Sequence, residues 1–94
     1  MTEEPKKERK KTVYERVVSH MHGIDDTIRD TIVYPSRDTV IGISEGEDML
    51  VLTGASNHDD GGHPQMIWIN TEHVDALRAL QEAITRVLAR VEKK

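Results

Sequence analysis

Residues 54–65, with the sequence GASNHDDGGHPQ, hold the side chains whose types best suit chemistry in this chain. His58, Asp59, Asp60 and His63 carry nitrogen and carboxylate groups of the kind that bind zinc and other divalent ions. Their spacing matches no established ligand motif, and Asp-Asp-Gly-Gly is also the composition of an ordinary turn. We therefore keep His58, Asp60 and His63 as weak candidates for a metal site, favour a mobile connection between two strands, and expect no cofactor.

Motifs for catalysis are missing from the sequence. There is no cysteine, so neither a thiol nucleophile nor a disulfide is available. There is also no glycine-rich phosphate loop and no nucleophile elbow. The adjacent acids at 25–26 and 59–60 are more typical of caps and turns than of an acid/base pair. A chain of 94 residues leaves little room for a substrate pocket. We expect that the protein is not an enzyme.

Charge is divided unevenly along the chain. Residues 1–11 contain five Lys or Arg and three Glu, a net charge of +2, whereas residues 12–94 contain 14 acids and eight Lys or Arg, a net charge of −6. We assign 1–11 to a disordered charged tail and 12–94 to a single domain. Nucleic-acid binding requires a basic surface, so we do not expect it from this acidic body.

The hydropathy of the sequence argues against a membrane as a partner. No segment reaches the roughly 20 apolar residues of a membrane-spanning helix, and the N-terminal residues lack an apolar signal core. We expect a soluble protein of the cytoplasm.

The elements that would position these side chains follow from apolar spacing. Residues 13–22 are predicted to form a helix, with Thr12 and Glu15 as a capping box and Gly23 as a left-handed stop, although the β-branched valines leave a strand possible. Strands are predicted at 31–34, 39–44, 49–54 and 65–70, and residues 24–30 are ambiguous. A long helix with Asn70 or Thr71 as its N-cap ends the chain.

The predicted fold class is therefore α+β: an N-terminal helix, a three- to four-stranded antiparallel meander sheet and a long C-terminal helix packed on one sheet face. Alternation places one apolar set on the face expected to meet that helix: Ile41, Ile43, Leu50, Leu52, Ile67 and Ile69. The opposite face is also apolar, with Val40, Met49, Val51, Met66 and Trp68. Either the N-terminal helix or a partner, which is a second copy of the chain or another protein, must cover this second face.

The C-terminal helix is longer than the predicted strands, and its apolar stripe continues to its end. Leu77, Leu80, Ile84, Val87 and Val91 follow one another by three and four residues, the spacing of paired helices. The sequence therefore predicts a homodimer through the end of this helix, with Ile84, Val87, Leu88 and Val91 at the contact.

Four strands leading through IWINTEHVDALRALQEAI into a long helix resemble the positive-cofactor-four-type fold that binds single-stranded DNA. The resemblance covers residues 30–90 in architecture and rests on Ile67, Ile69, Asn70, Glu72 and Leu77. Small strand-then-helix proteins of actinobacteria and their phages are similar too. The resemblance implies a curved antiparallel sheet, a following helix and dimerisation.

In that family the sheet supplies basic and aromatic residues to the nucleic acid. Here Arg29 and Arg37 are the bases of the strand region, and Tyr34 and Trp68 are its aromatic residues. The resemblance therefore gives the fold and no binding residue.

Three functional hypotheses follow. The first is a small non-catalytic interaction protein, a phage- or mobile-element-encoded modulator that binds a host protein through the apolar sheet face or an acidic surface: Glu45, Glu47, Asp48, Asp59 and Asp60. The second is a coactivator-like protein that binds single-stranded nucleic acid. The third is a small metal-binding protein that uses the loop at 58–63.

Overall fold

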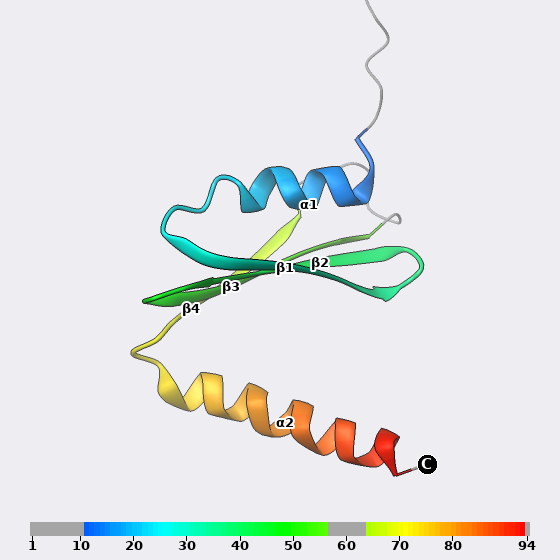
Figure 1. The fold of residues 1–94 in the computed structure, drawn as a ribbon, viewed down its shortest axis with the longest axis vertical. Helices are drawn as coiled ribbons and strands as arrows, with labels where there is room; N and C mark the ends of the chain where they lie inside the picture. Colours follow the sequence, from blue (N-terminus) through cyan, green and yellow to red (C-terminus); the bar gives the residue numbers. More distant parts are fainter. Residues whose placement is uncertain (1–10, 57–63, 94) are drawn as a thin grey trace, which may run out of the picture.

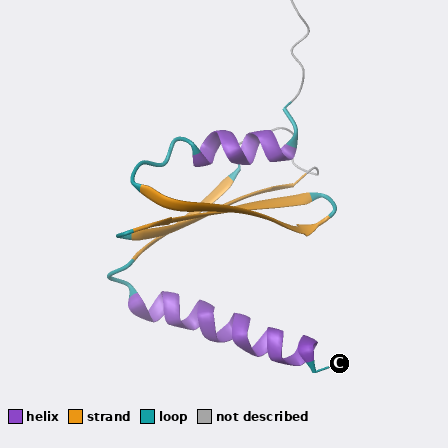
Figure 2. Ribbon diagram, viewed as in Figure 1, coloured by secondary structure: helices purple, strands orange, loops and turns teal. Residues whose placement is uncertain are grey.

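The protein folds into one antiparallel sheet with a helix on either side (Figures 1 and 2). This computed structural model describes residues 11–56 and 64–93. The elements, in chain order, are α1 (Val13–Met21), β1 (Thr27–Ser36), β2 (Thr39–Gly46), β3 (Met49–Ser56), β4 (Gln65–Asn70) and α2 (Val74–Glu92). The strands pair in the order β1-β2-β3-β4. The predicted α+β layout with a meander sheet is confirmed.

The start of α1 matches the prediction from sequence. The Thr12 backbone N–H donates to Glu15 Oε1 at 2.9 Å, and the Glu15 N–H donates to Thr12 Oγ1 at 3.1 Å, which completes the capping box. The end of α1 differs, because Gly23 does not adopt a left-handed conformation. The left-handed residue is instead Asp26, with φ of 64°, at the turn into β1.

Strand β1 is longer than the sequence predicted at both ends. The ambiguous segment at 24–30 contributes its last four residues to the strand, and the strand continues through Pro35 to Ser36. Proline is tolerated there because β1 is an edge strand, where one row of backbone N–H groups needs no partner. The register shifts between Thr27 and Arg29 and again between Val33 and Ser36.

The core lies between α1 and one face of the sheet. Val13, Val17 and Met21 of α1 are buried against Val40 and Ala55. Gly42 lets the helix approach, because a Cβ there would collide with Met21 Sδ and would lie 3.0 Å from Val17 Cγ1. The sequence allowed either the N-terminal helix or a partner to cover this face. In the structure, the N-terminal helix α1 covers it.

Helix α2 lies on the opposite side of the sheet from α1 (Figure 1). It begins after His73, which makes no side-chain capping bond, so the prediction of Asn70 or Thr71 as the N-cap is wrong. The expected close packing on the sheet is not found either, because no residue of α2 is buried. The Thr71 N–H donates to the Asp48 carbonyl at 3.0 Å, and this bond helps to set the direction in which the chain leaves the sheet.

Candidate protein-interaction surfaces

The sheet face turned away from α1 is apolar and incompletely covered. Strand pairing places Val33 opposite Ile41, Ile43 opposite Leu52, and Leu50 opposite Ile69. We call this surface the open face and define it by its apolar residues: Val33, Ile41, Ile43, Leu50, Leu52, Ile67 and Ile69. None of them is buried, and Ile67 is 57% exposed.

A second apolar surface runs along α2. We call it the α2 stripe and define it by Val74, Leu77, Leu80, Ile84, Val87, Leu88 and Val91. Leu77 is half-buried, and the other six are between 40% and 59% exposed. Among the described residues, 12 large hydrophobic side chains are exposed, and eight of them belong to the open face or the α2 stripe. Scattered exposed hydrophobic residues are normal, but contiguous ones mark binding surfaces.

The five residues predicted to bind a partner on the α1 side of the sheet differ in how exposed they are. Val40 and Val51 are buried, 5% and 0% exposed, so they cannot contact a partner while α1 is in place. Met49 and Met66 are half-buried, and Trp68 on β4 is 54% exposed. Alternation of side chains located this face correctly, but it could not show that α1 packs on β2 and β3 and leaves Trp68 beside it.

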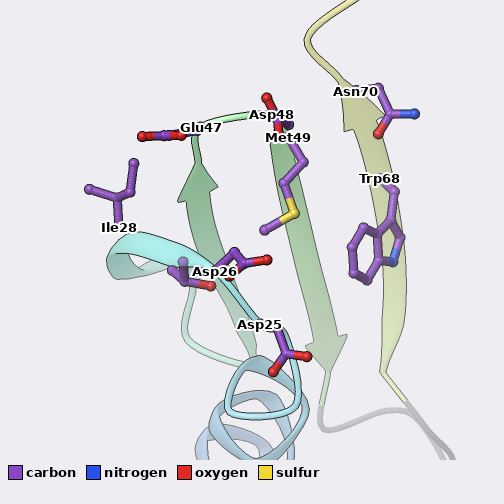
Figure 3. Close-up of a pocket in the computed structure, with 9 residues that line it drawn as sticks. Asp25, Asp26, Ile28, Glu47, Asp48, Met49, Trp68 and Asn70 are labelled. Atoms are coloured by element: carbon purple, nitrogen blue, oxygen red, sulfur yellow. The ribbon is translucent and has the colours of Figure 1, made fainter.

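An acidic hollow of about 670 Å³ lies next to Trp68. Figure 3 shows Asp25 and Asp26 coming from the segment before β1, Glu47 and Asp48 from the turn between β2 and β3, and Trp68 from β4. The remaining lining residues are Thr27, Ile28, Met49 and Asn70. All four carboxylate residues are exposed, and within the described ranges none of them takes part in an ion pair. The hollow therefore presents concentrated negative charge beside an aromatic ring.

Sheet topology explains why these distant residues meet. In an antiparallel meander the start of the first strand, the turn between the second and third strands and the end of the fourth all lie at one end of the sheet. Gly46 also helps, because a Cβ there would be 2.9 Å from the Asp26 carbonyl oxygen. Asp25, Asp26 and Asn70 were not predicted to form a surface, although the predicted meander would have placed all three at this end of the sheet.

The predicted acidic surface is brought together only in part. Glu47 and Asp48 line the hollow, whereas Glu45 lies opposite Arg29 and Leu50 on the side of the open face. Asp59 and Asp60 fall outside the described residues, as do His58 and His63. The metal hypothesis for that loop therefore stays a prediction. Residues 11–56 and 64–93 bring no three His, Asp or Glu side chains together as a metal site.

The dimer contact predicted at the end of the C-terminal helix is accessible in the single chain. Ile84, Val87, Leu88 and Val91 are 48% to 59% exposed. Their apolar character together with this exposure makes them available for a contact with another chain.

Neither helix of the described chain combines the length and the hydropathy that a membrane span requires. No protein-family model, curated protein or solved structure matches the sequence. The resemblance to the positive-cofactor-four-type fold therefore stays a prediction.

Proposed function

We propose that this chain is a small non-catalytic interaction protein that binds another protein chain through the open face and the α2 stripe. The supporting observation is that α2, the longest helix, buries none of its residues although it carries seven large apolar side chains. Burying such a side chain fully contributes about 1.5–3 kcal/mol, so a helix that leaves its stripe in water forgoes a large stabilisation. Binding a further chain would recover it.

A homodimer is the form in which the isolated protein would cover this surface. Trp68 and the acidic hollow lie on the α1 side of the sheet and would stay accessible in such a dimer. The modulator of a host factor that the sequence suggested would bind that factor through the open face and the α2 stripe. The origin of the chain in a phage or mobile element stays a prediction.

Nucleic-acid binding is the second hypothesis, and the strands give it little support. Across the four strands of the sheet, Arg29 is the single basic residue. A single guanidinium would neutralise one phosphate, whereas proteins that bind nucleic acid tightly make several such contacts.

Charged substitutions in the α2 stripe test the proposal. Ile84→Glu and Leu88→Glu should each abolish the associations that the full-length protein makes, as followed by light scattering and by capture of partners from lysate. Tyr14→Glu is the matched control, because Tyr14 is 47% exposed on α1 and Leu88 is 49% exposed on α2. All three variants should keep the circular dichroism of the parent.

Two outcomes would overturn the proposal. One is a parent protein that associates with nothing, itself included. The other is loss of association in Tyr14→Glu with retention in both α2 variants, which would assign binding to the α1 side.

A further inference from the structure

We propose that the open face of each chain is covered by α2 of a second copy, with the two α2 helices antiparallel about a two-fold axis. This inference rests on the proposed function and names the chain that occupies the surface. It differs from a contact between helix ends alone, because it joins the two uncovered surfaces of the molecule reciprocally: the sheet of one copy with the helix of the other.

The two surfaces have matching lengths. Helix α2 has 19 residues, which span about 28 Å at 1.5 Å each. Strands β2 and β3 have eight residues each, which span about 26 Å at roughly 3.3 Å per residue. One helix can therefore cover the centre of the open face from end to end.

The available area also suits a stable dimer. Four strands about 4.8 Å apart give the open face a flat area of roughly 500 Å². A helix face about 10 Å wide adds roughly 280 Å² along α2. One helix of that width covers only about 10 Å of the roughly 19 Å wide sheet, or roughly 260 Å² of the open face. The contact would therefore bury roughly 540 Å² per copy and roughly 1,080 Å² in total, just above the roughly 1,000 Å² expected of a specific interface. A contact between the ends of two helices alone would bury far less.

Charge selects the antiparallel arrangement. Near the start of α2, on the side of the open face, the acidic residues Glu45, Glu72 and Asp75 outnumber Arg29. The far end of α2 is basic, because Arg86, Arg90 and Lys93 outnumber Glu92. Antiparallel helices would place each basic end at the acidic end of the other copy, whereas parallel helices would place like charges together.

A two-fold axis makes the contact self-limiting. In such an interface the same pair of surfaces meets twice, so both open faces and both α2 stripes are covered in one closed dimer. Neither of these two surfaces is left over to recruit a third copy. The acidic hollows remain on the two outer sides of the assembly.

Cysteine cross-linking of the full chain tests whether α2 of a second copy covers the open face. The method is suitable because the natural sequence has no cysteine. Ile67 on the open face and Ile84 on α2 are 57% and 58% exposed in the single chain. A double variant with Ile67→Cys and Ile84→Cys, treated with a short bifunctional maleimide, should give a product of two chain masses. One control is Ile84→Cys alone, which measures any cross-link between the two α2 helices. The other is Tyr14→Cys with Ile84→Cys, which should give no product beyond that, because Tyr14 lies on α1, on the other side of the sheet.

A second pair of variants tests the direction of the helices. Single variants Glu45→Cys and Lys93→Cys, refolded together, should cross-link to each other across two chains, because Glu45 lies on the side of the open face. Cross-linking of Lys93→Cys to itself with none to Glu45→Cys would indicate parallel helices and overturn the proposed arrangement.

The remaining outcomes separate this inference from the proposed function. A product of one chain mass from Ile67→Cys with Ile84→Cys would show α2 covering its own sheet, and would overturn both. A monomeric parent that gives no cross-link, yet captures another protein in a manner abolished by Ile84→Glu, would overturn the second copy as occupant. The same result would leave the interaction function standing.

Discussion

Gly42 sets how closely α1 can approach the sheet. It lies on β2 opposite Ile32 and Thr53, on the face that α1 covers. Any side chain at this position would enter space that Met21 and Val17 already fill. Because Val17 is fully buried, it cannot move outward without opening the small core.

Gly42→Ala should therefore destabilise the protein by about 1–3 kcal/mol through overpacking. Gly54→Ala is the matched control on the neighbouring strand, because a Cβ there would meet only Ile41 Cγ1, at an ordinary 3.9 Å. Urea unfolding followed by circular dichroism measures both. Equal stability of the two alanine variants would contradict the packing described for α1.

Helix α1 is the element whose structure the sequence specified most fully. The capping box at Thr12 and the apolar spacing of Val13, Val17 and Met21 predicted both its start and its buried face. Such local signals lie within a few residues, so a single sequence contains them. The sequence left two alternatives for what covers this face of the sheet, α1 or a partner. The spacing of residues within one element does not specify which other element packs on it.

The acidic hollow and the position of α2 were not predicted from the sequence. Asp25 and Glu47 line the same hollow because of the way the strands pair. The register shifts in β1 could not be predicted from the composition of the strand. Helix α2 was predicted as an element, but its N-cap and its packing were not. Its start at His73 depends on the turn bonded to Asp48 rather than on a side-chain cap.

Thr12→Ala should weaken α1 at the level of the whole element. Loss of an N-cap hydroxyl costs about 1 kcal/mol, and in a domain of this size that lowers Tm by roughly 4–8 °C. Ser19→Ala serves as the control, because Ser19 is exposed in the interior of the same helix and caps nothing. Thermal unfolding would contradict the role of the capping box if Thr12→Ala and Ser19→Ala melted at the same temperature.

At the scale of the whole molecule, charge separates the first 11 residues from the rest. The net charge of −6 on residues 12–94 opposes contact with a phosphate backbone, whereas residues 1–11 carry +2. Any binding of single-stranded DNA at low salt should therefore disappear when residues 1–11 are removed. Fluorescence anisotropy with a labelled oligonucleotide measures this. Sub-micromolar binding by the truncated chain at about 150 mM salt would instead favour the nucleic-acid hypothesis.

One chain leaves the apolar residues of the open face and of the α2 stripe uncovered. If a second copy covers them, as we propose, the α2 stripe lies inside the interface. Leu88→Glu would then place an unpaired charge in the interface, and that burial costs several kcal/mol. The variant should lose the dimer and keep the fold, because Leu88 is exposed in the single chain.

Light scattering on a size-exclusion column, with the full-length chain at tens of micromolar, tests this claim most directly. We expect a mass of twice the 10.7 kDa chain value for the parent, and the single-chain value for Leu88→Glu. A parent mass of 10.7 kDa at that concentration, unchanged by Leu88→Glu, would contradict the account.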